Sequence, residues 1–236
     1  MAGTVRRVLW ILVVPFTLLL AGTCDAQPHD KNWSICTSDT DNDNVIIQSC
    51  TAVIHAENEA DANLAIAFKN LCLAYNDKGD HDRAIQNCDQ AIRLNAGFID
   101  AYLFRGHAYF NKGDNDRAIQ DYDKAITLDP NEAATFVERG AAYHIKGDNV
   151  RAIEDLDQAI RLDPNDATAF YVRGAAHQAE NENDHAIQDY GQAIKLAPNF
   201  AASHYLRGVL EKQMGDISGG DADIAQARHI DPDGGK

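Results

Sequence analysis

Two oppositely charged residues recur along the sequence at a constant spacing. Four arginines follow one another every 34 residues, and an aspartate lies 16 residues after each of them. The pairs are Arg105 with Asp121, Arg139 with Asp155, Arg173 with Asp189, and Arg207 with Asp223. A guanidinium group and a carboxylate can form two parallel hydrogen bonds, within one repeat or between neighbours. An active site needs such a pair once, so the repetition indicates a structural ion-pair ladder and not a catalytic arginine.

The cysteines are a second group of residues that could form bonds. Four of them lie beyond the N-terminal segment: Cys36, Cys50, Cys72 and Cys88. In an exported protein this even number permits two disulfides. We predict a Cys36–Cys50 bond, which closes a 15-residue loop and would contribute about 3 kcal/mol by the loop-entropy estimate. Cys72 and Cys88 are either a second bonded pair or two buried small apolar residues, and the sequence favours neither.

An acidic segment has part of the pattern of a calcium-binding loop. Asp39, Asp41 and Asp43 have the spacing with which such a loop begins. Asn44 stands where the loop needs its turn glycine, and Cys50 stands where it needs a bidentate glutamate. We therefore interpret the segment as the acidic start of a helix, where the helix dipole favours negative charge.

Histidines are the remaining residues that could coordinate a metal. His107 and His144 occupy nearby positions of successive repeats, but isolated histidines on helices more often pack or face solvent than bind zinc. The sequence contains no pattern typical of a nucleophile with its base, and none typical of a phosphate-binding glycine loop. It therefore predicts no metal site, no cofactor and no enzymatic activity.

The first residues have the pattern of a secretory signal peptide. An arginine pair precedes a thirteen-residue apolar run, and small residues follow it, which predicts a leader of residues 1–26 and a periplasmic or secreted protein. The run is shorter than the ~20 residues of a membrane span, so we expect no span in the mature chain. A lipid anchor on Cys24 is the weaker alternative, because Ala21 and Thr23 fit a lipoprotein signal poorly.

The overall composition predicts a folded and strongly acidic protein. Of its 236 residues 45% are hydrophobic and 24% are charged, and the formal net charge is −15. Such a chain repels phosphate backbones and anionic membrane surfaces. We therefore exclude nucleic acid as a partner.

Counting in steps of 34 from Ala65 divides most of the chain into five units, at residues 65–98, 99–132, 133–166, 167–200 and 201–234. Rings recur at positions 4 and 11 of the units, and small residues recur at positions 8, 20 and 27. Each unit has two stretches with apolar residues at helical spacing, separated by turn residues. A single hairpin of helices cannot bury its own apolar faces, so the units are expected to stack.

This pattern resembles the tetratricopeptide repeat (TPR), which has the same period and the same residue types at these positions. The resemblance implies an all-α fold: a right-handed α-solenoid of five helix-turn-helix units, within an array of residues 61–236. We interpret residues 27–60 as an N-terminal cap with one capping helix, which the Cys36–Cys50 bond ties to the segment before it. The leader and the cysteine pair make the chain similar to exported bacterial TPR proteins. Gly219 and Gly220 weaken the last unit.

The resemblance also implies a binding groove, because the first helices of TPR units line a concave face. The residues that would line it here are Lys69, Leu73, Leu103, His107, Phe110, Val137, Ala141, His144, Tyr171, Ala175 and Tyr205. An apolar surface of this kind marks a binding site, and the acidic chain would attract a partner with basic residues around an apolar core. The TPR subgroup that clamps a terminal carboxylate is disfavoured: Lys69 fits its pattern, but Leu73 and Phe104 do not.

The main functional hypothesis is a non-catalytic protein–protein interaction adaptor of the periplasm or secretory space, which binds apolar peptide segments in this groove. The alternative is a carrier of a lipid or small hydrophobic ligand in the same groove. A third hypothesis is an assembly subunit of an envelope complex that docks through its weak last unit. The sequence determines neither the partner nor the oligomeric state.

Overall fold

The structure, a computed structural model, describes residues 31–38, 40, 42–56 and 59–232. The predicted leader with Cys24, as well as Asp39, Asp41 and the last four residues, lies outside this part. The described residues form twelve α-helices and no strand. In chain order these are α1 (Lys31–Cys36), α2 (Asp43–Ile54), α3 (Asp61–Asp77), α4 (His81–Leu94), α5 (Ile99–Asn111), α6 (Asn115–Leu128), α7 (Ala133–Ile145), α8 (Asn149–Leu162), α9 (Ala167–Ala179), α10 (Asn183–Leu196), α11 (Ala201–Gln213) and α12 (Ile217–Ile230).

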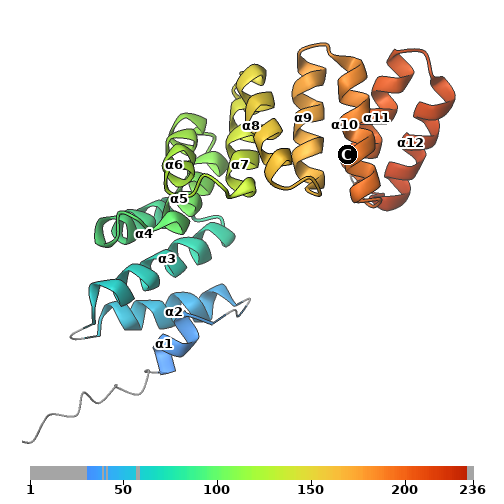
Figure 1. The fold of residues 1–236 in the computed structure, drawn as a ribbon. Helices are drawn as coiled ribbons and strands as arrows, with labels where there is room; N and C mark the ends of the chain where they lie inside the picture. The colour runs from blue at the N-terminus through green and yellow to red at the C-terminus, as the bar shows by residue number, and fades with distance from the viewer. Residues whose placement is uncertain (1–30, 39, 41, 57–58, 233–236) are drawn as a thin grey trace, which may run out of the picture.

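The helices from α3 to α12 pack as five consecutive hairpins that stack into an arc (Figure 1). Each hairpin pairs an odd-numbered helix with the next even-numbered one, and each also contacts the following hairpin. The odd helices α3 and α5 touch each other directly, as do α7 and α9. The predicted all-α solenoid of helix-turn-helix units is confirmed. No helix in the described part of the chain is long and apolar enough to span a membrane.

The turn inside a hairpin forms because glycine and aspartate follow one another. Gly113 has a φ of 77°, in the left-handed region that ends a helix at little cost to glycine. The next residue, Asp114, caps α6, because its side chain accepts a hydrogen bond from the backbone N–H of Arg117. The fourth hairpin differs: Asn181 takes the left-handed conformation there, with a φ of 64°.

Close packing inside a hairpin depends on the small residue at position 8 of the unit. A Cβ atom added to Gly106 would lie 2.6 Å from Cε1 of Tyr122, and one added to Gly174 would lie 2.9 Å from Cε1 of Tyr190. Both tyrosines are fully buried. Glycine on the first helix therefore makes room for a ring on the second.

The cap contains two helices and not the single helix predicted. Besides the expected helix α2, residues Lys31–Cys36 form the six-residue helix α1. Trp33 and Cys36 are three residues apart and therefore lie on one face, which packs against Ile46 and Val53. Leu71 of α3 completes this apolar cluster. Most residues around α1 are polar, so the sequence did not indicate a helix there. Its helical form depends on the packing of Trp33 and Cys36.

Candidate functional site

A cavity of about 820 Å³ lies at the N-terminal end of the array, between the cap and α3. Its walls include Lys69 and Leu73, two of the predicted groove residues, together with Ile66 and Phe98. The Lys69 ammonium lies 5.9 Å from the ring centroid of Phe98 and 3.7 Å from a carboxylate oxygen of Asp100. This cavity therefore combines apolar side chains with one partly neutralised cation, and hydroxyl groups and the carboxylates of Asp43 and Asp77 also line it.

A smaller cavity of about 250 Å³ lies between α5 and α7 and contains Leu103 and His107. Carboxylates surround it, and they belong to Asp100, Asp129, Glu132 and Glu138. The Nε2 atom of His107 lies 3.6 Å from Oε1 of Glu138. The cavity thus has two large aliphatic residues, Ile99 and Leu103, within a rim of four carboxylates, one of which, that of Asp100, also faces Lys69.

The other predicted groove residues differ in how much surface they offer. Tyr205 is 48% exposed, whereas Val137 is only 8% exposed because it packs in the central core. Phe110 also packs partly against that core, and Tyr171 lies with its ring centroid 4.8 Å from that of Phe200.

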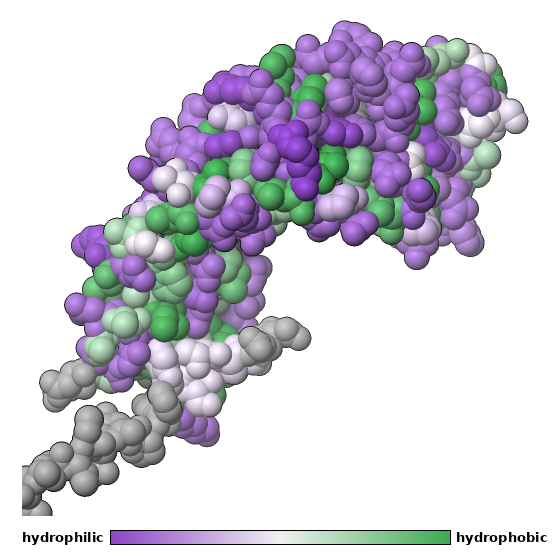
Figure 2. Space-filling view, in the orientation of Figure 1, coloured by the Kyte–Doolittle hydropathy of each residue, from purple (hydrophilic) through white to green (hydrophobic). Residues whose placement is uncertain are grey.

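The three remaining residues of the prediction are half-buried: Ala141, His144 and Ala175. In the view of Figure 2, apolar residues form separate patches along the arc, with hydrophilic residues between them. Of the predicted groove residues, Lys69 and Leu73 line the N-terminal cavity and Leu103 and His107 line the α5–α7 cavity, whereas the other seven lie outside the described lining of both. A binding role for these residues stays a prediction.

The ion-pair ladder is present in each of the four units that carry its residues. Arg139 donates from Nε to Oδ2 of Asp155 at 2.8 Å and from Nη2 to Oδ1 at 2.6 Å. Arg105 with Asp121 and Arg173 with Asp189 repeat this geometry. Arg207 forms the same two bonds with Asp223, at 2.6 and 2.9 Å. Each of these pairs joins the two helices of one hairpin by a bidentate bond.

A third nitrogen of the arginine joins neighbouring hairpins, which the sequence analysis missed. The Nη1 atom donates to an aspartate of the preceding unit: Arg105 to Asp89 at 2.5 Å, Arg139 to Asp123 at 2.6 Å, and Arg173 to Asp157 at 2.7 Å. The signal was an aspartate at position 25 of the first three units. In the fourth unit that position is Gly191, so Arg207 lacks this bond.

The contacts of the ladder favour the charged form of its arginines. Hydrogen bonds to Asp155 raise the pKa of Arg139 above its ordinary value, and they outweigh its burial, which acts in the opposite direction. Hydrogen bonds to Asp223 likewise raise the pKa of Arg207. The arginines therefore stay ionised, and the ladder has the properties of a structural element.

Both pairs of cysteines lie at disulfide distance. The Cα atoms are 4.8 Å apart in Cys36–Cys50 and 5.3 Å apart in Cys72–Cys88, within the range that a disulfide requires. The first pair joins α1 to α2, and the second joins the two helices of the first hairpin. Of the two alternatives for Cys72 and Cys88, the structure favours the bonded pair.

Comparison with protein families identifies the repeats. Residues 106–147, 140–181 and 179–215 match the family described as TPR repeat, and residues 70–98 match the family described as tetratricopeptide repeat. The chain belongs to the tetratricopeptide repeat family. A search of curated proteins finds no match to the sequence.

Solved TPR proteins share the fold. A crystal structure of MamA is 24% identical, with a TM-score of 0.63, and the match covers 69% of this chain and 95% of MamA. The piece of MamA from Desulfovibrio magneticus RS-1 described as 41-end is 20% identical, with a TM-score of 0.66, over 75% of this chain and 100% of that chain. YrrB, described as a TPR protein with an unusual peptide-binding site, is 22% identical, with a TM-score of 0.61, over 79% of this chain and 94% of YrrB. At these identities the likeness is one of fold.

Proposed function

We propose that this TPR protein is a non-catalytic protein-interaction adaptor that binds a peptide segment with an apolar side chain flanked by basic residues. The TPR fold itself suggests an interaction module. The finer proposal rests on one observation: in the α5–α7 cavity, Leu103 lies among the carboxylates of Asp100, Asp129, Glu132 and Glu138.

The aliphatic and acidic residues of that cavity favour a peptide with an apolar side chain and basic flanks. An apolar side chain that packs against Leu103 would be removed from contact with water, which favours binding. A lysine or arginine on either side of it would face the carboxylates. A peptide with acidic flanks would meet like charges instead, and the net charge of −15 would add to the repulsion at a distance. The description of YrrB, a protein of the same fold, supports a peptide as the ligand class.

The proposed location is the periplasm or another compartment of the secretory route. Two cysteine pairs at disulfide distance support an oxidising environment, and the N-terminal residues have the signal-peptide pattern described above. The location of the protein in cell fractions, together with the N-terminal sequence of its mature form, tests this part of the proposal.

Binding to a peptide array tests the proposed ligand class. The array carries peptides with a central leucine or phenylalanine, flanked by lysine and arginine in one set and by glutamate in the other. We expect the purified protein to bind the first set preferentially. Glu132→Lys should weaken that binding on the order of tenfold at low salt, because it reverses one charge of the rim.

Glu154→Lys is the matched control, since it makes the same change of charge at another exposed glutamate, outside the described lining of the cavity. It should leave binding nearly unchanged. Equal binding of both peptide sets, or equal losses in the two variants, would contradict the proposal.

A carrier function is the second candidate, and the N-terminal cavity favours it. Its volume of about 820 Å³ lies within the range of small-molecule sites, and Ile66, Leu73 and Phe98 provide apolar contacts. Native mass spectrometry of the protein purified from its own cells would detect a bound lipid. A lipid lost in Leu73→Asp but retained in Glu132→Lys would assign the carrier function to this cavity.

A further inference from the structure

The fourth hairpin departs from the first three at three positions that contact one another. In the third hairpin these positions are Tyr143, Asp148 and Arg151: the Arg151 guanidinium carbon lies 4.4 Å from the Tyr143 ring centroid, and its Nε donates to Asp148 at 2.6 Å. The first and second hairpins have the same arrangement of tyrosine, aspartate and arginine. In the fourth hairpin the three positions hold His177, Glu182 and His185.

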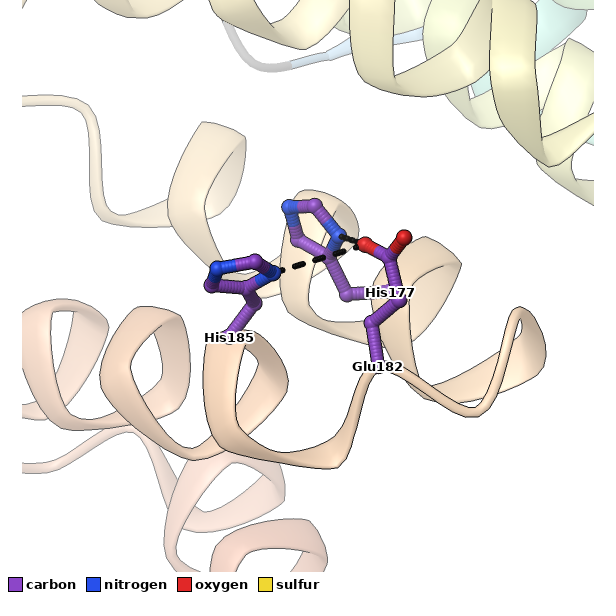
Figure 3. A group of neighbouring side chains, drawn as sticks. All are labelled: His177, Glu182 and His185. Carbon is purple, nitrogen blue, oxygen red and sulfur yellow. Dashed lines mark hydrogen bonds and ion pairs between the residues drawn. The ribbon is translucent and has the colours of Figure 1, made fainter.

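The three replacements direct metal-binding atoms toward one point, as Figure 3 shows. The Nδ1 atom of His177 lies 2.7 Å from Oε2 of Glu182, and Nδ1 of His185 lies 3.5 Å from the same oxygen. One ligand atom from each residue lies within 4.8 Å of the other two. A tetrahedral zinc ion, with bonds of about 2.0–2.1 Å, holds its ligand atoms roughly 3.4 Å apart. Small side-chain rotations would therefore place an ion among them.

The glutamate has also lost the role that its position serves elsewhere. Asp80, Asp114 and Asp148 each accept a hydrogen bond from a backbone N–H in the first turn of the following helix. Glu182 precedes α10 in the same way but makes no side-chain capping bond. Its carboxylate contacts the two histidines instead, so helix capping does not explain the cluster.

We propose that His177, Glu182 and His185 form a binding site for one late first-row divalent metal ion, represented by Zn²⁺. Two imidazoles and a carboxylate are ligands that zinc accepts, and three protein ligands leave one coordination position for water or another ligand. Glu182 and His185 have side chains that are 49% and 64% exposed, so the ion can enter from solvent.

The ladder lies next to the most buried of the three ligands. The His177 side chain is only 14% exposed, and its Nε2 lies 3.8 Å from Oδ2 of Asp189, which is beyond hydrogen-bond distance. Asp189 is itself held by Arg173. Its negative charge would favour a metal-bound imidazole, and a small shift would let it accept a hydrogen bond from Nε2, as the carboxylates behind metal-binding histidines do.

The charges around the cluster determine whether a cation is tolerated there. The start of α10 carries the positive end of the helix dipole, which opposes a metal ion. Glu182 compensates this directly, and Asp184 in the first turn of α10 adds a second negative charge. The net charge of −15 further raises the local concentration of cations.

Titration of Zn²⁺ into the metal-free full protein, followed by calorimetry, tests the proposal, and the absorption spectrum with Co²⁺ reports the ligands. We expect one ion per chain. His185→Ala should weaken binding by at least about tenfold, the range found when support for a metal site is lost.

The decisive control is the triple variant His177→Tyr/Glu182→Asp/His185→Arg. It rebuilds the residue set of the third hairpin, so it should stay folded, with an unchanged circular dichroism spectrum, and should not bind the ion. Absence of zinc binding in the natural protein, or equal binding in the triple variant, would overturn the proposal.

Discussion

The first hairpin and the four that follow it hold their two helices together by different bonds. In the first, Cys72 and Cys88 lie at disulfide distance across the hairpin. In the second, the same two positions hold Gly106 and Tyr122, and the adjacent positions hold Arg105 and Asp121, which form a bidentate ion pair. The first hairpin thus has a covalent cross-link where the second has the ring of Tyr122 packed on Gly106, with an ion pair next to it.

The reason for the difference lies in what each hairpin packs against. Leu71 takes the place of the ladder arginine in the first hairpin and contacts the apolar cluster of the cap. From the second hairpin onward the preceding unit offers an aspartate, and the arginine reaches it. Before the last hairpin, Gly191 of the fourth unit replaces that aspartate, and the nearest further carboxylate to Arg207 is that of Glu211, at 3.7 Å. The arginine at position 7 therefore bonds to the preceding unit only where that unit has an aspartate at position 25, whereas its bond within the hairpin forms in all four units.

Breaking one ladder pair is expected to have the largest effect. Asp155→Ala should lower the free energy of unfolding by about 3–5 kcal/mol, because Arg139, with a side chain only 19% exposed, would lose two hydrogen bonds. Urea denaturation followed by circular dichroism measures this.

The control gives the third hairpin the residues of the first. Arg139→Leu/Asp155→Asn, which copies Leu71 and Asn87, removes both charges and should cost less than Asp155→Ala alone. A single variant as stable as the natural protein would contradict a stabilising ladder.

Removing the cross-link of the first hairpin should have the next largest effect. Cys72→Ala/Cys88→Ala should lower the stability by about 3 kcal/mol, from the loop entropy of a bond between residues separated by 16 positions. Hydrogen exchange should show the loss mainly in α3 and α4, because stability in stacked repeats depends on nearest neighbours. The matched variant Cys36→Ala/Cys50→Ala should instead affect α1 and α2. Loss of protection spread evenly over α9 to α12 would argue against this local role.

Restoring the missing ladder bond should have the smallest effect, and it should stabilise the protein. An added Cβ at Gly191 lies 3.3 Å from Nη1 of Arg207, so Gly191→Asp brings a carboxylate to an arginine nitrogen that lacks one. We expect a gain of about 1 kcal/mol from helix propensity and the ion pair together.

Gly191→Asn separates the two contributions, because asparagine has nearly the shape and helix propensity of aspartate without its charge. The additional gain of the aspartate should diminish at high salt. An aspartate variant no more stable than the asparagine variant would mean that the ladder does not extend between these units.

The sequence alone determined the repeat, its period and the residues of the ladder, because each of these depends on spacing along one chain. A helix places positions 7 and 8 at a fixed distance from each other, and the same residue types return there in four of the five units, so the pattern is visible without coordinates. The all-α solenoid follows from this and is confirmed.

Tertiary structure decided everything that depends on two units or on the end of the array. Three of the four ladder arginines form a third bond that crosses from one hairpin to the next. The repeat pattern of a single unit does not indicate which position of the preceding unit the arginine reaches. Helix α1 is fixed by contacts of Trp33 and Cys36 with the cap cluster, which outweigh the polarity of its sequence. The convergence of His177, Glu182 and His185 depends on how one turn orients three side chains, and sequence spacing alone does not specify that orientation.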